Sequence, residues 1–199
     1  MHLAQTCVVL GILAVPALAS AQIKQPGAHP QYSAELEPHL ILQWNESCQN
    51  EGFGPGFRAT IPFLDNGPIP RINNNMGISF GLDWAHSSVN SNCRAYYRNG
   101  AYYGNGYTAD VWSIPVVVQW NFFLVPKVSV FGEAGLVLQH RRYDGNFNCN
   151  NNNFCDGVGA ENGADAAFAA GGRFLVSDSV GFLIRLGYPY LSVGVSILL

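Results

Sequence analysis

Apolar and polar residues alternate along most of this chain. The C-terminal segment 190–199 shows the pattern, because its odd-numbered residues from Leu191 to Leu199 are all aliphatic while most of the even-numbered ones are small. Successive side chains of a β-strand point to opposite faces, so the segment has one aliphatic face. The same period of two recurs in 32–44, 76–85 and 109–124. The pattern predicts amphipathic β-strands throughout the chain.

Turn signals divide the chain into eight predicted strands. They cover 32–44, 53–64, 76–85, 109–124, 128–141, 164–176, 180–188 and 190–199. A tilted strand of about ten residues crosses an apolar layer of about 25 Å, and eight is the smallest even number of strands that closes a membrane barrel. Aromatic residues at strand ends predict interfacial girdles: Tyr32, Trp44, Trp84, Trp112, Trp120, Phe122 and Tyr188. The predicted fold class is all-β, an eight-stranded antiparallel up-and-down transmembrane β-barrel.

Composition supports a membrane environment. Charged residues make up 12% of the chain, against about 25% in an average soluble domain. A soluble barrel or sandwich would need a surface with about 25–35% charged residues. The formal net charge of −3 and the lack of a basic patch argue against nucleic-acid binding.

The N-terminal residues predict an export signal. Val8–Ala19 is an apolar run that contains Pro16 and precedes the small residues Ala19, Ser20 and Ala21. The alternative, an uncleaved membrane anchor, is disfavoured because the run is shorter than the roughly 20 residues of a spanning helix. The predicted organisation is a signal peptide at 1–21, a periplasmic N-terminal segment at 22–31 and an outer-membrane barrel at 32–199.

The connections between strands differ in length. With the N-terminus in the periplasm, segments 65–75, 125–127 and 177–179 are predicted periplasmic turns. The predicted external loops are 45–52, 86–108 and 142–163, rich in Asn, Gly and Tyr. The last connection, near Tyr188–Tyr190, is short for an external loop.

The prolines within strands predict local irregularity. Pro62 and Pro115 lie inside predicted strands and face inward by parity. Proline lacks the N–H donor that a ladder needs, so β-bulges are expected at these two positions.

All four cysteines of the predicted mature chain lie in the predicted external loops: Cys48, Cys93, Cys149 and Cys155. An even number in an exported chain predicts disulfides, and four cysteines allow three pairings. We favour a local Cys149–Cys155 bond and a Cys48–Cys93 bond between loops. A metal site is disfavoured because the Cys-x5-Cys spacing is wide and no histidine is near. No metal and no cofactor is predicted.

The polar faces of the strands carry charges of both signs: Glu35, Glu37, His39, Arg58, Asp83, Glu133, Arg173 and Arg185. Parity places Glu37 and Arg58 on neighbouring strands, and Glu133 and Arg185 at comparable depth. Unpaired charges in a narrow barrel are costly, so we expect an ion-pair and hydrogen-bond network. An interior plug is favoured over a gated pore or a proton-active site, because side chains fill an eight-stranded barrel.

These features together, an export signal, eight amphipathic strands and a polar interior, resemble small outer-membrane β-barrel proteins of the OmpA/OmpX-like superfamily. The resemblance covers the whole mature region and implies a monomer in the outer membrane of Gram-negative bacteria. It also implies surrounding lipid and lipopolysaccharide and insertion by the barrel machinery. The last residue given, Leu199, differs from the Phe or Trp that is usual in the family, and no peptidoglycan-binding domain is expected.

The expected function is non-enzymatic: envelope structure or surface interaction through the external loops. The predicted contact surface is in the second loop, where aromatic and Arg residues gather: Arg94, Tyr96, Tyr97, Arg98, Tyr102, Tyr103 and Tyr107. The alternatives are a narrow channel or a lipid A-modifying enzyme of the deacylase or acyltransferase type. For such an enzyme, His86, Ser87 and His140 lie at the expected height near the outer rim. No catalytic residue is assigned, and the external partner is not predicted.

Overall fold

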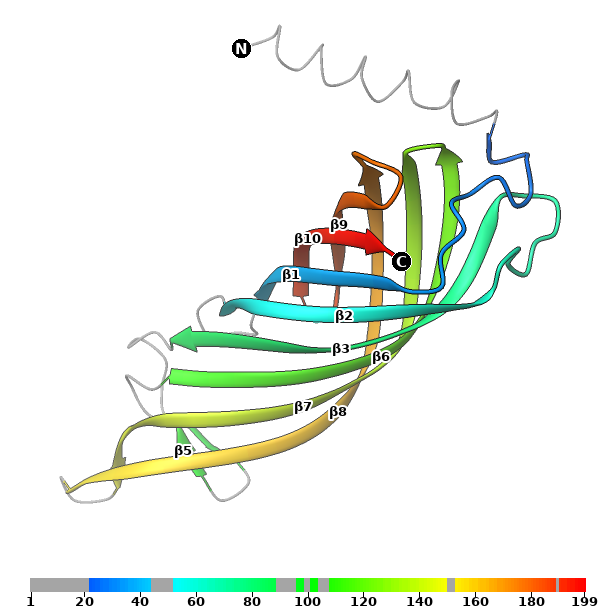
Figure 1. The fold of residues 1–199 in the computed structure, drawn as a ribbon. Helices are drawn as coiled ribbons and strands as arrows, with labels where there is room; N and C mark the ends of the chain where they lie inside the picture. The colour runs from blue at the N-terminus through cyan, green and yellow to red at the C-terminus, as the bar shows by residue number, and fades with distance from the viewer. Residues whose placement is uncertain are drawn as a thin grey trace, which may run out of the picture.

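The computed structural model describes residues 22–43, 52–88, 96–98, 101–103, 108–149, 153–188 and 190–199. Eight strands form a closed antiparallel barrel in the order β1-β10-β9-β8-β7-β6-β3-β2 (Figure 1). The barrel strands are β1 (Glu35–Gln43), β2 (Gly52–Leu64), β3 (Asn74–Ser88), β6 (Thr108–Val125), β7 (Val128–Cys149), β8 (Asn153–Leu175), β9 (Val180–Tyr188) and β10 (Tyr190–Leu198). Two short strands, β4 (Tyr96–Arg98) and β5 (Ala101–Tyr103), pair with each other outside the barrel. The predicted eight-stranded barrel is confirmed.

The first and last barrel strands close the sheet. Leu36 pairs with Ile197 and Leu42 with Leu191 in an antiparallel register between β1 and β10. Beyond the ladder, the Leu199 amide donates to the Ala34 carbonyl at 2.9 Å. Closure pairs the backbone groups of both strands, as a structure that crosses lipid requires. No helix among the described residues has the length and hydropathy needed to cross a membrane.

Apolar side chains face outward on every barrel strand. Examples are Leu40, Leu136 and Phe182, which are 52%, 60% and 60% exposed. The alternate residues face the lumen and are largely polar, such as Ser79 and Gln119, both fully buried. A continuous belt of exposed aliphatic and aromatic side chains around a closed barrel needs a lipid surround. The barrel therefore spans a membrane, with the inward–outward parity that the sequence predicts.

The prediction of a third external loop over residues 142–163 is wrong. Strand β7 continues to Cys149 and β8 begins at Asn153, in one unbroken antiparallel register from the barrel to the tip. The Asn- and Gly-rich composition is typical of loops, but ladder hydrogen bonds come from the backbone and continue when a partner strand stays in register. The second loop is also shorter than predicted, because β3 runs to Ser88 and β6 starts at Thr108. The β7–β8 hairpin consequently projects beyond the rest of the barrel (Figure 1).

Bulges occur at one of the two prolines where they were expected. The β2–β3 register shifts between Pro62 and Leu64, as predicted. At Pro115 the prediction is wrong, because this residue pairs with Val137 in continuous register. The second irregularity lies between Phe123 and Val125, at the end of β6.

The segment before β1 packs against the end of the barrel that carries the short turns. The Asn73 amide donates to the Ile23 carbonyl at 2.7 Å, and the His29 ring stacks on Phe123 with centroids 4.6 Å apart. His29 Nε2 also lies 2.7 Å from the Asp65 carbonyl. These three contacts hold residues 23–29 against the β2–β3 turn and the end of β6. The predicted signal peptide, 1–21, lies outside the described residues.

Candidate functional site

The most organised polar site is the charged lumen. The structure places all eight charged residues expected there inside the barrel, each at most 6% exposed. They come from six strands: β1 (Glu35, Glu37 and His39), β2 (Arg58), β3 (Asp83), β7 (Glu133), β8 (Arg173) and β9 (Arg185). Each points inward because the residues beside it on its strand belong to the lipid-facing parity.

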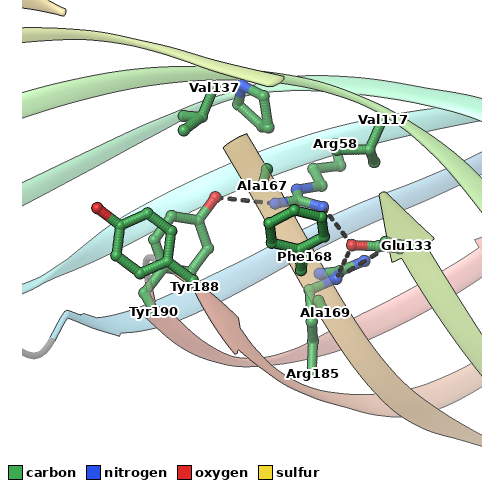
Figure 2. Close-up of a pocket in the computed structure, with 11 residues that line it drawn as sticks. Arg58, Val117, Glu133, Val137, Ala167, Phe168, Ala169, Arg185, Tyr188 and Tyr190 are labelled. Carbon is green, nitrogen blue, oxygen red and sulfur yellow. Dashed lines mark hydrogen bonds and ion pairs between the residues drawn. The ribbon is translucent and has the colours of Figure 1, made fainter. Parts of the chain in front are cut away.

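Glu133 is the centre of the network. Its Oε2 accepts a hydrogen bond from Arg58 Nη1 and its Oε1 accepts one from Arg185 Nε, each at 3.0 Å (Figure 2). Its Oε1 also accepts a hydrogen bond from Gln119 Nε2 at 3.0 Å. Arg185 Nη2 then donates to Glu37 Oε2 at 2.6 Å. One carboxylate therefore joins two guanidinium groups from strands on different sides of the lumen.

The pairing in this central cluster differs from the neighbour relation along the sheet. Glu37 and Arg58 are direct partners in the β1–β2 register, yet Glu37 pairs with Arg185. Arg58 pairs with Glu133 at 3.0 Å and, more distantly, with Asp83 at 3.9 Å. The sequence places Glu133 and Arg185 at comparable depth, and in the structure Arg185 Nε lies 2.9 Å from Glu133 Oε2. The Glu37–Arg185, Arg58–Glu133 and Glu133–Arg185 pairs thus link strands that share no ladder.

A second cluster lies nearer the short turns. Arg173 Nη2 donates to Glu35 Oε2 at 2.5 Å and Arg173 Nη1 to Ser129 Oγ at 3.3 Å. The Ser196 hydroxyl donates to the other oxygen of Glu35. Both oxygens of this buried carboxylate are therefore hydrogen-bonded, as a buried charge requires.

Tyr32 lies beside this second cluster, before the start of β1. Its hydroxyl accepts a hydrogen bond from Asn75 Nδ2 at 3.0 Å, so its predicted placement in a lipid-facing interfacial girdle is wrong. Burial raises the pKa of the Tyr32 hydroxyl to about 12, and the group stays neutral at physiological pH. The predicted strand starts too early here, because the regular ladder begins at Glu35.

A third cluster lies towards the long loops. Asp83 Oδ1 is 2.9 Å from His39 Nε2, and Asp83 Oδ2 accepts a hydrogen bond from the Tyr190 hydroxyl. Arg58 Nη2 donates to the Tyr190 oxygen at 2.8 Å, which joins this cluster to the central one. Tyr190 is a network member that the sequence reasoning missed; its inward parity on β10 and its polar tip are the signals that identify it.

The lumen is filled by side chains at the level of the central cluster. Arg185 and Arg173 lie over the Phe131 ring, 5.3 and 5.8 Å from its centroid. A cavity of about 10 Å³ is lined by Arg58, Glu133, Arg185, Tyr190 and apolar neighbours (Figure 2). This is about the space of one water molecule. The network thus contains four carboxylates, three guanidinium groups and one imidazole.

The predicted loop contact surface is partly described. Tyr96, Tyr97, Arg98, Tyr102 and Tyr103 fall on the β4–β5 hairpin, with Tyr96 opposite Tyr103 and Tyr97 opposite Tyr102. Arg94 and Tyr107 lie outside the described residues. A two-stranded hairpin was not expected within this loop.

The cysteines are described in part. Cys48 and Cys93 lie outside the described residues. In the β7–β8 ladder, the backbone of Cys149 pairs with Asn153 and that of Cys155 with Phe147. The disulfide pairing stays a prediction. Among the described residues, no group of three or more His, Cys, Asp and Glu side chains is arranged to hold a metal ion.

The three rim residues considered for an enzyme are separated. His86 faces outward and lies 2.9 Å from Asp110, whereas Ser87 is buried on the opposite face of β3. His140 contacts Asn162 Oδ1 at 2.7 Å, on the β7–β8 hairpin. The combination of His86, Ser87 and His140 therefore does not form one site.

Comparison with known proteins finds similarity at the level of structure. No protein-family model and no curated protein matches the chain. Neisserial surface protein A (NspA) matches with a TM-score of 0.52 and 13% sequence identity, over 84% of this chain and 97% of NspA. Ail, the attachment invasion locus protein of Yersinia pestis, matches with a TM-score of 0.47 and 12% identity, over 84% of this chain and 96% of Ail. Ail in complex with the heparin analogue sucrose octasulfate matches with a TM-score of 0.44 and 12% identity, over 83% and 93%. The chain has the fold of NspA, a small eight-stranded β-barrel.

Proposed function

We propose that the protein is a monomeric barrel of the bacterial outer membrane with a plugged lumen, which acts in envelope structure or surface interaction through its external loops. The outward apolar belt requires a lipid surround, here the lipid and lipopolysaccharide of that membrane. Antiparallel barrels of this size are typical of the outer membrane. The predicted signal peptide supplies the export route, and insertion would be the work of the barrel machinery.

The proposal of a plugged lumen rests on one observation. Arg58 and Arg185 both donate hydrogen bonds of 3.0 Å to Glu133 across the lumen, and each of the three side chains is at most 6% exposed. A water-filled pore would leave such side chains solvated along its wall. A narrow channel is therefore the less favoured alternative, and the lumen itself is proposed to have no catalytic role.

Conductance in planar bilayers tests the plug. The purified wild-type barrel should show no steady ion current, whereas the Arg58→Ala/Glu133→Ala double variant, which shortens two side chains of the central cluster, should show discrete current steps. Lys127→Ala, in the exposed β6–β7 turn, is the matched control and should stay closed. An ohmic current in the wild type would contradict the plug and favour the channel.

The external end supports the contact role. The β7–β8 hairpin extends beyond β9, whose last residue, Tyr188, pairs with Phe168. The β4–β5 hairpin carries four tyrosines in six described positions, and tyrosine supplies large contact area at low entropic cost. Both hairpins belong to the end that is opposite the short turns (Figure 1).

A cell-binding assay tests this role. Bacteria that display the protein should bind cultured epithelial cells several-fold more than bacteria without it. Replacing Tyr96, Tyr97, Tyr102 and Tyr103 by Ser should remove the difference, while Tyr188→Ser, on the lipid-facing wall, should not. Equal binding with and without the intact hairpin would contradict the contact role. Fractionation of the same cells, with sequencing of the mature N-terminus, should find the protein in the outer membrane beginning at Gln22.

A further inference from the structure

A band of polar side chains lies on the lipid-facing wall, just beyond the outer aromatic belt. Trp84 on β3 and Trp112 on β6 are partners in the register, with ring centroids 6.2 Å apart. His86, two residues after Trp84 on β3, pairs with Asp110, two residues before Trp112 on β6. Because tryptophan rings settle at the membrane–water interface, the His86–Asp110 pair lies at the level of lipid headgroups and acyl-ester groups.

The geometry of this pair indicates which nitrogen of the neutral imidazole carries the proton. His86 Nδ1 is 2.9 Å from Asp110 Oδ1, and the two side chains are 47% and 33% exposed. A carboxylate accepts hydrogen bonds, so in the neutral imidazole Nδ1 carries the proton and Nε2 has the free lone pair. This is the arrangement in which a carboxylate orients a histidine to act as a general base.

A serine follows on the same face of the same strand. Ser88 lies two residues after His86, exposed and directed to the lipid side like His86. Residues at this spacing have Cα atoms roughly 7 Å apart, a distance that the imidazole and hydroxyl side chains can bridge. In the neighbouring ladder, Arg142 is the exposed partner of Asp110 and supplies a cation of the kind that binds lipid phosphate.

We propose that Ser88, His86 and Asp110 form a hydrolytic site for acyl esters of the lipids that surround the barrel. His86 Nε2 takes the proton of the Ser88 hydroxyl as its oxygen bonds to the ester carbonyl carbon. The carbon–oxygen bond to the lipid then breaks, and the lipid oxygen leaves as an alcohol with the proton from His86. Water attacks the acyl-serine with the same base, which releases a fatty acid and restores Ser88.

The neighbouring residues show why this serine and this histidine are chosen. Ser87 is 3% exposed and its hydroxyl lies 3.5 Å from the Ala109 carbonyl, inside the barrel. His140 is held by the neutral amide of Asn162, which stabilises an imidazolium less than a carboxylate does, and the residue two positions after it is Arg142. The site is thus distinct from the lumen network and adds an activity to the proposed surface role.

The test measures fatty-acid release by mass spectrometry from the full-length barrel reconstituted in two kinds of vesicle. One contains lipopolysaccharide and the other glycerophospholipid alone, so the two sources of acyl ester are distinguished. We expect release from at least one of them. Ser88→Ala and His86→Ala should lower the rate on the order of 10³-fold, with Asp110→Asn also impaired. Ser87→Ala and His140→Ala are matched controls and should keep the wild-type rate.

A long-chain alkyl fluorophosphonate tests the nucleophile separately from turnover. Peptide mapping should place the covalent adduct on Ser88, and the adduct should be absent in His86→Ala. Migration on an unheated denaturing gel shows whether each variant still forms the barrel. No fatty acid from either vesicle together with no adduct on Ser88 would overturn the proposal, as would equal loss in Ser87→Ala. Neither result would affect the plug, whose test is conductance.

Discussion

Removing the Glu133 carboxylate is the sharpest perturbation of the lumen. In Glu133→Ala, Arg58 Nη1, Arg185 Nε and Gln119 Nε2 lose their common acceptor. Breaking a buried ion pair on one side typically costs about 3–5 kcal/mol, because the remaining charge stays buried. Arg185 retains Glu37 and Arg58 retains Tyr190 as partners. We therefore expect a loss near the lower limit, about 3 kcal/mol of unfolding free energy.

Two further variants separate the charge from the volume. Glu133→Gln keeps the shape and one acceptor oxygen, so its cost should fall between wild type and Glu133→Ala. Glu133→Ala/Arg185→Ala removes both partners of one pair and should cost less than the sum of the single changes, with a coupling energy of roughly 0.5–3 kcal/mol. Lys127→Ala, in an exposed turn, should change stability by less than about 0.5 kcal/mol.

Urea unfolding in lipid vesicles, followed by tryptophan fluorescence, measures these free energies. The barrel carries Trp84, Trp112 and Trp120 on its wall, so loss of the fold changes their environment. Additive effects near zero for all Glu133 and Arg185 variants would refute the argument. They would mean that water solvates these groups and that the lumen is not sealed.

Further predictions follow from the wall and the loops. The unheated barrel should migrate differently from the boiled protein on a denaturing gel, and a mature protein that stays monodisperse without detergent would contradict the membrane assignment. Unreduced peptides should show no free thiol at the four mature cysteines, whereas four alkylatable thiols in intact outer membranes would refute both disulfides. Gly135→Ala should destabilise the barrel by about 1–3 kcal/mol, because an added Cβ would lie 2.3 Å from the Val116 carbonyl oxygen. Gly132→Ala, on the same strand with open space at its Cβ, should be near neutral in the same unfolding assay.

The sequence predicts the wall of the barrel well, because parity alone decides which side chains meet lipid. Leu82 and Asp83 differ by one position, and the structure exposes the first and buries the second. A one-residue error in parity would have exchanged the exposed and the buried residue. The alternation therefore suffices to predict which segments are strands and which charged residues face the lumen. The alternation predicts neither the ends of the strands nor the length of the β7–β8 hairpin. In that hairpin, backbone pairing continues through a segment whose composition is typical of loops.

The partners inside the lumen are beyond such reasoning. The sequence makes Glu37 and Arg58 neighbours along the sheet, yet Glu37 pairs with Arg185 from the opposite side of β10. Distances across a barrel depend on strand tilt and stagger, which no local pattern specifies. Long Arg side chains then reach whichever carboxylate lies at their height, and Tyr190 joins because its hydroxyl arrives at the same level as Asp83.

Residues that are adjacent in sequence face opposite sides of the barrel wall and therefore meet different chemical environments. Ser87 faces the lumen and Ser88 faces the lipid, so residues adjacent in sequence belong to different sites. The two sites lie on opposite sides of the wall, and changes at distant independent sites are expected to add. Combining Ser88→Ala with Glu133→Ala should therefore leave the stability loss of Glu133→Ala unchanged, while fatty-acid release falls as in Ser88→Ala alone. A coupling of more than about 1 kcal/mol between them would show that the wall transmits strain from the lumen to the rim.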